Sequence, residues 1–318
     1  MLSVQRHKDG IRERLQIGRE IKRIDGLYEI SGVLIASWTN PDTTRAIGFV
    51  GPEERGRRAV QEVRHLATRS YWDPVHVSDL QEGLHVSFAY AGSLWIERIS
   101  PGWRPEGIGE PHIQSSRILD SFREGGLNRL LLSSGPGAPP ALKVVDLPRG
   151  EVIETLSLKR SPRHAALSAI GDGPTVIAAL DDDGNLSIHA DGRILAECPG
   201  AFPLPTYDGG SWMSRDERGN VYVVWTSELD GNTLPVIGAR VSVDRGELRA
   251  EIKLLLRATH NPPGRKAVLL GGKENLFLGW IDSARGEETT AIGCWKDPIN
   301  CPQGQVTWRP RPDYLVIP

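Results

Sequence analysis

Short apolar runs separated by polar turn residues recur along most of the chain. A Gly-Asn turn leads into the run Asn220-Val-Tyr-Val-Val-Trp225, and a polar segment at Asp230–Asn232 separates this run from a second one that starts at Ile237-Gly238. Runs of this length, rich in Val, Tyr and Trp and bounded by Gly, Asn and Asp, predict β-strands joined as a hairpin. Because the apolar residues are nearly continuous rather than alternating, we expect strands that are covered on both faces.

This hairpin repeats along the chain. Asn275-Leu-Phe-Leu-Gly-Trp280 matches Asn220–Trp225 after 55 residues (275 − 220), and Ile292-Gly293 stays in step with Ile237-Gly238. A third copy ends at Trp38 and is followed by Ile47-Gly48. Recurrence at a nearly fixed period is the signature of a repeat architecture.

The 187 residues between Trp38 and Trp225 (225 − 38) leave room for further units of roughly 47 residues, and weaker strand pairs occur at that spacing. The pairs are Leu84–Tyr90 with Leu94–Ile99, Leu130–Leu132 with Leu142–Asp146, and Thr175–Leu180 with Leu186–His189. Shorter apolar stretches flank each pair, which gives four strands per unit and about six units. The pattern predicts an all-β fold, a six-bladed β-propeller of four-stranded antiparallel blades.

We expect residues 25–318 to form one propeller domain, with blades at roughly 25–70, 71–114, 115–160, 161–204, 205–259 and 260–318. Residues 1–24 are predicted to be an N-terminal arm or a closing strand. The strand-like Tyr314–Ile317 is expected to complete a blade with N-terminal sequence and so to close the ring. Arg57–Leu66 fits either a short outer helix or a twisted outer strand, and we favour the strand.

Composition narrows the function classes. The chain has 318 residues, 39% of them hydrophobic and 25% charged, with a net charge of −2, so no overall positive field favours nucleic acid. No apolar run is long enough to cross a membrane, and the polar N-terminus has no signal-peptide pattern, so we expect a cytoplasmic protein. Three cysteines are too few for a disulfide framework, although Cys294 and Cys301 could face each other across a short loop. Without a Cys-x-x-Cys pair or a His motif, we predict no metal and no cofactor.

One unit resembles the sialidase-like propellers built from BNR repeats, whose blades end in an Asp-box, Ser-x-Asp-x-Gly-x-x-Trp. Ser242, Asp244 and Gly246 match its first half, and Arg249 stands at the Trp position. The resemblance implies the propeller fold. Sialidases also carry an Arg-Ile-Pro motif, a three-arginine clamp and a catalytic Tyr, Glu and Asp; no Arg-Ile-Pro occurs in this chain, so the resemblance does not imply sialidase activity.

In a propeller, the loops after the second strands and the loops entering each blade meet around the central channel, where ligands bind. Aromatic rings and acids there suit sugars, peptides and cations. The residues predicted to contact a ligand are Trp38, Tyr90, Asp182, Trp225, Asp230, Trp280 and Arg285. A repeated Trp also fits the core between blades, and that alternative stays open. Asp183-Gly184-Asn185 has the composition of a hairpin turn rather than of a calcium loop.

These features favour a binding module whose ligand is a polar small molecule, a glycan or a peptide. The first alternative is an enzyme, a glycoside hydrolase or a lyase or cyclase, in which Glu228 and Asp282 act as acid and base. The second is a scaffold that holds protein partners on its rim. Neither nucleic acid nor a membrane is expected as a partner, and the sequence leaves the chain a monomer or an oligomer of unknown size.

Overall fold

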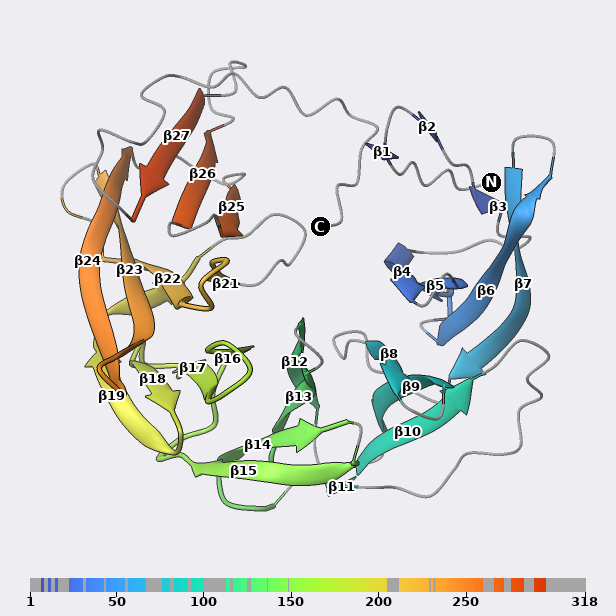
Figure 1. Ribbon diagram of the computed structural model, residues 1–318, viewed down its shortest axis with the longest axis horizontal. Helices are drawn as coiled ribbons and strands as arrows, with labels where there is room; N and C mark the ends of the chain where they lie inside the picture. Colours follow the sequence, from blue (N-terminus) through green and yellow to red (C-terminus); the bar gives the residue numbers. More distant parts are fainter. Residues whose placement is uncertain are drawn as a thin grey trace.

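The computed structural model describes most of the chain as β-strands joined by short loops (Figure 1). The described residues are 7–8, 11–12, 15–16, 23–30, 33–42, 44–54, 57–66, 76–80, 83–90, 93–99, 113–114, 117–124, 127–135, 137–147, 149–204, 212–228, 230, 233–259, 266–271, 276–282 and 289–295. None of these residues lies in a helix, so none forms a helix that could span a membrane. The all-β prediction is therefore confirmed.

The first two sheets come from the first 114 residues of the chain. In the first sheet the strand order is β3-β7-β6-β5-β4, and β3 pairs in parallel with the outer strand β7; its members are β3 (Leu15–Gln16), β4 (Arg23–Ile30), β5 (Val33–Thr39), β6 (Arg45–Glu54) and β7 (Arg57–Leu66). The predicted strand at Arg57–Leu66 is thus confirmed. A separate ribbon pairs β1 (His7–Lys8) with β2 (Ile11–Arg12). The second sheet contains β8 (His76–Leu80), β9 (Gly83–Tyr90), β10 (Ser93–Ile99) and β11 (Ile113–Gln114).

Four more sheets follow in chain order. The third contains β12 (Ile118–Glu124), β13 (Leu127–Ser133), β14 (Ala141–Asp146) and β15 (Glu151–Ser157), and the fourth contains β16 (His164–Ala169), β17 (Thr175–Leu180), β18 (Leu186–Ala190) and β19 (Arg193–Cys198). The fifth contains β20 (Ala201–Pro203), β21 (Met213–Arg215), β22 (Val221–Ser227), β23 (Thr233–Asp244) and β24 (Glu247–Thr259). The sixth has β25 (Lys266–Gly271), β26 (Leu276–Asp282) and β27 (Thr289–Cys294) among the described residues.

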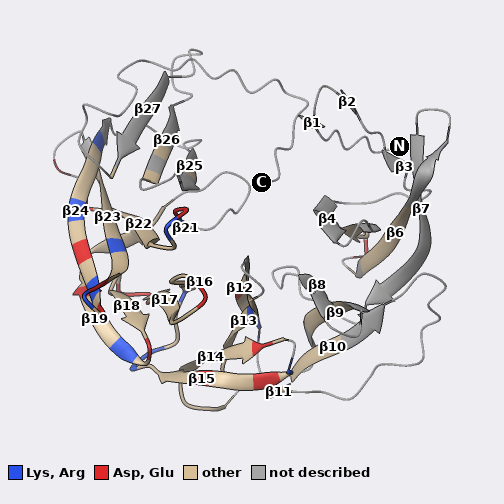
Figure 2. Cartoon of the chain, in the orientation of Figure 1, with Lys and Arg blue, Asp and Glu red and all other residues tan. Residues whose placement is uncertain are grey.

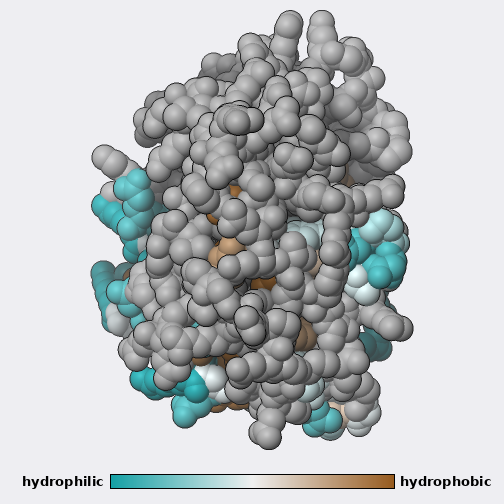
Figure 3. Space-filling view, turned by 90° about the vertical axis from the view of Figure 1, so that its right-hand side faces the viewer, coloured by the Kyte–Doolittle hydropathy of each residue, from teal (hydrophilic) through white to brown (hydrophobic). Residues whose placement is uncertain are grey.

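These sheets follow one another around a common centre (Figure 1). The strands β4, β8, β12, β16, β21 and β25 lie on the inner side, and β7, β11, β15, β19 and β24 lie on the outer side. In the side view of Figure 3, hydrophilic residues coloured teal lie mainly at the two sides and along the lower edge, and hydrophobic residues coloured brown lie nearer the middle. This arrangement is that of propeller blades.

The hydrophobic core lies between consecutive sheets. Along β17, Ile177 and Ala179 pack against the third sheet, whereas Val176, Ala178 and Leu180 pack against the fifth. All six residues of β17 are buried, so this strand is covered on both faces, as its continuous apolar sequence predicts. Each sheet therefore gains its stability from burial against its neighbours rather than on its own.

In the fifth sheet, close packing explains why the second residue of the recurring Ile-Gly pair is a glycine. A Cβ atom at Gly238 would lie 2.8 Å from Leu255 Cδ1 and 3.3 Å from the ring of Trp295. Trp295 follows β27 of the sixth sheet, and its buried ring meets Tyr222 edge-on with centroids 5.4 Å apart, while Lys253 Nζ lies 4.5 Å from the ring centroid. The missing side chain at Gly238 thus makes room for the aromatic residue that joins two sheets.

The inner side of the fifth sheet differs from that of its neighbours because two separate strands pair with β22. Ala201–Pro203 (β20) lies beside the end of β22, with Pro203 opposite Trp225. Met213–Arg215 (β21) lies beside the beginning of β22, with Met213 opposite Val223. The chain thus leaves this position after β20 and returns to it at β21.

Candidate functional site

The candidate site lies at the end of the ring where the chain enters each innermost strand and where each second strand stops. We call this the entry end. In the fourth sheet it carries residues 159–163, which lead into β16, and residues 181–185, which join β17 to β18. In the fifth sheet it carries β20, Glu228 and Asp230. At this end the N–H of Ala201 on β20 donates to the carbonyl oxygen of Gly184, so a loop of the fourth sheet contacts the fifth sheet.

The loop between β17 and β18 is held by Asp181. Its carboxylate accepts hydrogen bonds from the backbone N–H groups of Asp183 (3.0 Å) and Asn185 (2.9 Å) and from the Asn185 side chain (3.0 Å). Asp183 forms an ion pair with Arg160. Burial acts to raise the pKa of Asp181, but the bonds from Asn185 and the charge of Arg160 outweigh it and lower that pKa. The loop is a turn held by its own side chains, which agrees with the predicted hairpin turn.

His164 lies at the start of an innermost strand, close enough to this loop to be influenced by its charges. It is the first residue of β16 and is half-buried. Burial lowers its pKa, and the positive charges of Arg163 and Arg117 lower it further, while the negative charge of Asp182 acts in the opposite direction. The imidazole is therefore neutral at pH 7, and it lies within electrostatic range of two cations and one carboxylate. Asp182, one of the predicted ligand-contacting residues, is exposed beside this group.

Phe202 supplies an exposed aromatic ring at the same end. It lies on β20 opposite Thr226, and 48% of its surface is exposed. The N–H of the preceding residue, Ala201, donates to the carbonyl oxygen of Gly184 at 2.8 Å, so β20 is attached directly to the loop that carries Asp182. Sequence reasoning missed Phe202 because its exposure depends on how β20 pairs with β22, and no repeated motif marks it.

The predicted Trp residues lie elsewhere. Trp38 and Trp225 are 1% and 2% exposed, and Trp225 belongs to the core between the fourth and fifth sheets. The Trp38 indole N–H donates to Asn40 Oδ1 at 3.1 Å. Tyr90 ends β9 and Trp280 lies on β26, but the described structure does not extend to their side chains, and Arg285 lies outside the described residues. Ligand contact by these residues therefore stays a prediction, and the burial of Trp38 and Trp225 favours the core alternative.

The predicted acids have different surroundings. Asp230 is exposed and forms an ion pair with Arg257 of the outer strand β24. Glu228 is exposed next to the end of β22. Asp282 is the last residue of β26, and its side chain is not among those described. No group of three or more His, Cys, Asp or Glu residues suited to a metal ion occurs among the described residues.

A carboxylate that was not predicted lies between two innermost strands. Asp120 of β12 accepts the backbone N–H of Leu167 on β16 at 2.7 Å and that of Ser121 at 2.8 Å. Burial raises its pKa to about 6, although the two hydrogen bonds act to lower it. The strand bulges just before this residue, between Ile118 and Asp120. Asp120 thus binds an N–H on the open edge of the neighbouring innermost strand and joins the third sheet to the fourth.

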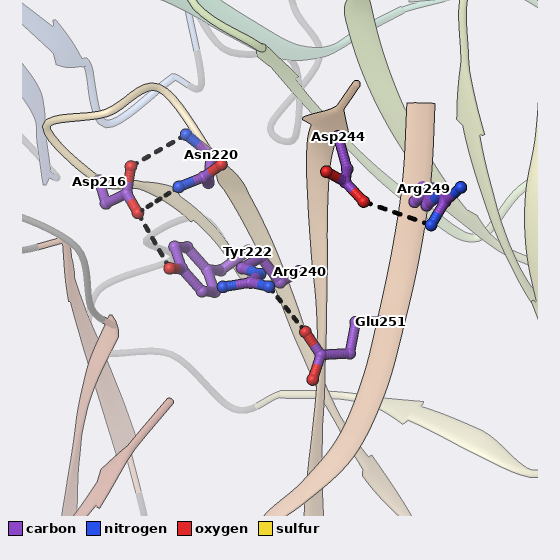
Figure 4. A network of polar contacts seen from close by, with 7 residues as sticks. All are labelled: Asp216, Asn220, Tyr222, Arg240, Asp244, Arg249 and Glu251. Atoms are coloured by element: carbon purple, nitrogen blue, oxygen red, sulfur yellow. Dashed lines mark hydrogen bonds and ion pairs between the residues drawn. The ribbon is translucent and has the colours of Figure 1, made fainter. Parts of the chain in front are cut away.

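The opposite end of the fifth sheet carries a second polar network (Figure 4). Asp216 is 3% exposed and accepts hydrogen bonds from Asn220 Nδ2 (2.8 Å) and from the Tyr222 hydroxyl (2.9 Å), and Arg240 donates to Glu251 at 2.8 Å. Burial and the neighbouring Asp216 raise the pKa of Tyr222, so its hydroxyl stays protonated and donates.

The half Asp-box forms the turn between β23 and β24 in this network. Arg245 and Gly246 both have positive φ angles, 50° and 82°, as a two-residue hairpin turn requires. Arg249, at the Asp-box Trp position, is exposed and donates to Asp244 at 3.3 Å and to Glu247 at 2.9 Å. An ion-paired arginine therefore occupies the position where the Asp-box has a Trp.

Comparisons with known proteins support the fold alone. No protein-family model matches the chain, and no curated protein matches it in sequence. Among solved structures it is similar to the Dos1 propeller (TM-score 0.50, 8% identity, 85% of this chain and 67% of that one). Other matches are hydrazine synthase of Kuenenia stuttgartiensis (TM-score 0.49, 15% identity, 86% and 77%) and BBS1N in complex with ARL6DN (TM-score 0.41, 14% identity, 86% and 92%). Together with the sheets arranged around a common centre, the Dos1 match shows that the chain has a β-propeller fold.

Proposed function

We propose that this propeller is a binding protein that holds a polar ligand, a small molecule, glycan or peptide, at the entry end of its fourth and fifth sheets. The supporting observation is that Arg163 and Asp182 lie within electrostatic range of His164, and that Phe202 lies on β20, which is hydrogen-bonded to the loop that carries Asp182. We call these four residues the entry cluster. It combines a cation, a neutral imidazole, a carboxylate and an exposed ring. This set of groups can form directional hydrogen bonds with a polar ligand and stack on its flat face.

The surroundings of two acidic residues, Glu228 and Asp120, favour binding over catalysis. Glu228, the described member of the proposed acid and base pair, is exposed. Asp120 does have the raised pKa that is common among catalytic acids, but both of its hydrogen bonds come from backbone N–H groups that join two sheets. The enzyme alternative with Glu228 and Asp282 remains a prediction for mutation.

We further propose that the propeller has six blades and that Tyr314–Ile317 completes a blade with N-terminal sequence and so closes the ring. We also propose that the protein is cytoplasmic. The half Asp-box supports a distant relation to sialidase-like propellers. The six sheets of three or more strands among the described residues support the blade number.

A ligand screen followed by mutation tests the proposal. Thermal-shift measurements with a panel of mono- and oligosaccharides, amino acids and short peptides would find a ligand that raises the melting temperature. Phe202→Ala and Arg163→Ala are then expected to weaken its binding about tenfold each, because one stacked ring or one charge-assisted hydrogen bond contributes about 1.4 kcal/mol.

The matched control is Glu217→Ala, which removes an exposed charge at the opposite end of the fifth sheet and is expected to leave the affinity unchanged. Unchanged affinity in both Phe202→Ala and Arg163→Ala would show that the ligand binds elsewhere. A panel in which no compound shifts the melting temperature would count against a small polar ligand.

A further inference from the structure

The outer edge of the fifth sheet differs from the outer edges of the first, third and fourth sheets. The bulged residue in the outer strand of the third sheet is Ile153, and in the fourth sheet it is Leu195, so each edge is broken after two residues. The outer strand of the first sheet is covered by β3. In β24 the bulge falls at Leu255, and the run Glu247–Leu254 stays in regular register with β23. Bulges and covering strands prevent edge pairing, and this run has neither among the described residues.

The free backbone groups of this run follow from the hairpin turn. Asp244 and Glu247 close a two-residue turn and therefore form a hydrogen-bonded pair. In an antiparallel ladder the direction of the backbone N–H and C=O groups alternates from residue to residue. Glu247 points its groups toward β23, so Leu248 and every second residue after it point their groups away from β23. The outward-pointing residues are Leu248, Ala250, Ile252 and Leu254. Figure 1 places β24 on the outer side of the sheets.

The side chains of this edge are complementary to those of a second, antiparallel copy of the same strand. The sequence is Glu247-Leu-Arg-Ala-Glu-Ile-Lys253, and acidic and basic residues alternate along it (Figure 2). A second copy in antiparallel orientation, centred on Ala250, would place every charge opposite its counterpart. The facing pairs would be Glu247 with Lys253, Arg249 with Glu251, Leu248 with Ile252, and Ala250 with Ala250. In this register the outward-pointing residues face each other as hydrogen-bonded pairs, and the charged residues form the closer, non-hydrogen-bonded pairs.

Exposed apolar side chains along the same edge also favour pairing with a second copy. Ile252 and Leu254 are 44% and 46% exposed, and Val243 on the adjacent strand is 49% exposed. Val243 lies opposite Leu248, so Val243, Leu248 and Ile252 share one face of the hairpin. Pairing Leu248 with Ile252 of a second copy would remove this apolar surface from water.

We propose that β24 pairs antiparallel with β24 of a second copy of this chain, centred on Ala250, and so forms a homodimer. The contact is made by strand addition at a sheet edge. It lies on the outer side of the ring, away from the innermost strands that carry the entry cluster. The dimer therefore leaves that cluster open to a ligand.

Sedimentation of the full chain over a range of concentrations tests this proposal. The wild type is expected to reach twice the monomer mass as concentration rises. Ala250→Pro is expected to stay monomeric with a melting temperature close to that of the wild type, because the lost N–H points outward and the ladder to β23 stays complete. A wild type that stays monomeric would overturn the proposal and leave the edge to an extended segment of another protein.

A charge exchange gives a second readout, in which two single variants are compared with their mixture. Glu247→Lys alone places Lys opposite Lys253, and Lys253→Glu alone places Glu opposite Glu247, so each variant is expected to be monomeric. Mixed in equal amounts, the two variants regain opposite charges at both positions and are expected to form a mixed dimer. Glu151→Lys, on the bulged edge of the third sheet, is the control and is expected to dimerise like the wild type. Dimers that persist in both single variants, or a mixture that stays monomeric, would overturn the proposal.

Discussion

Two loops with the same five-residue pattern, Asp-x-x-Gly-Asn, occur at opposite ends of neighbouring sheets. Asp181–Asn185 joins β17 to β18 at the entry end, and Asp216–Asn220 joins β21 to β22 at the other end. In both, the aspartate accepts hydrogen bonds from the backbone N–H two residues on, from the backbone N–H of the asparagine and from its side chain. The sequence pattern therefore fixes the local hydrogen bonding wherever it occurs.

The glycines of the two loops also behave alike. Gly184 and Gly219 have positive φ angles of 80° and 82°. The carbonyl oxygen of Gly184 accepts the N–H of Ala201 at 2.8 Å, and that of Gly219 accepts the N–H of Gly171 at 3.3 Å. Each loop is thus attached through its glycine to a neighbouring segment.

The loops differ in what covers them. Asp216 is 3% exposed and accepts one further hydrogen bond, from the Tyr222 hydroxyl, whose ring packs against Trp295. Asp181 is less buried, and its neighbours Asp182 and Asp183 are exposed. One motif therefore gives a core anchor in the fifth sheet and a surface turn beside the entry cluster in the fourth. Tertiary packing decides between these two roles.

The largest effect is expected from Asp216→Ala. The change leaves the backbone N–H groups of Arg218 and Asn220 and the buried hydroxyl of Tyr222 without their acceptor. Because buried donors that lose their partner each cost about 1 kcal/mol or more, we expect the free energy of unfolding to fall by about 3 to 4 kcal/mol. Urea unfolding followed by circular dichroism measures this change.

Glu217→Ala in the same loop is the control for that measurement. Glu217 is exposed, and its replacement is expected to change the free energy of unfolding by no more than about 0.5 kcal/mol. Equal costs for the two variants would show that the network around Asp216 does not anchor the fifth sheet.

Asp120 shows what happens when a buried carboxylate has fewer donors, and it predicts a pH dependence. Its pKa rises from the ordinary value of 3.8 to about 6, so between these values the folded protein retains a proton that the unfolded chain has released. The free energy of unfolding therefore decreases as pH rises from about 4 to 6, by up to about 3 kcal/mol from this residue.

Asp120→Asn tests this pH dependence because asparagine does not ionise. Relative to the wild type, the variant is expected to gain stability steadily from pH 4 to pH 6.5, whatever its constant offset. Urea unfolding at a series of pH values gives the difference. A difference that does not change with pH would contradict the prediction.

The sequence predicts the strands well because their signal is local. Thr175–Leu180 is a strand from its first residue to its last, since a continuous apolar run bounded by Gly-Pro and Asp residues suits a strand covered on both faces. The turn at Asp183–Asn185 was predictable for the same reason. What the repeat pattern left open was the place of the recurring Trp, because an indole at the end of a second strand fits both the mouth and the core. The burial of Trp225 depends on its packing between the fourth and fifth sheets.

The candidate site was less predictable because it depends on contacts between residues that are far apart in the sequence. The exposure of Phe202 follows from the pairing of β20 with β22, which joins residues more than twenty positions apart. Asp120 gains its role only when the backbone N–H of Leu167 from the next sheet reaches its carboxylate. Of the residues predicted to contact a ligand, Asp182 alone belongs to the entry cluster.

The smallest effect is expected from Asp181→Ala, the counterpart of Asp216→Ala. Its lost donors, the N–H groups of Asp183 and Asn185, lie in an exposed loop where water replaces the carboxylate, so we expect a cost of about 1 kcal/mol or less at pH 7. Since the pKa of Asp181 is lowered, its contribution is present above pH 4 and is lost as pH falls below that value. Urea unfolding at pH 7 and pH 3 measures both effects. If Asp181→Ala were as costly as Asp216→Ala, burial would not be what separates the two loops.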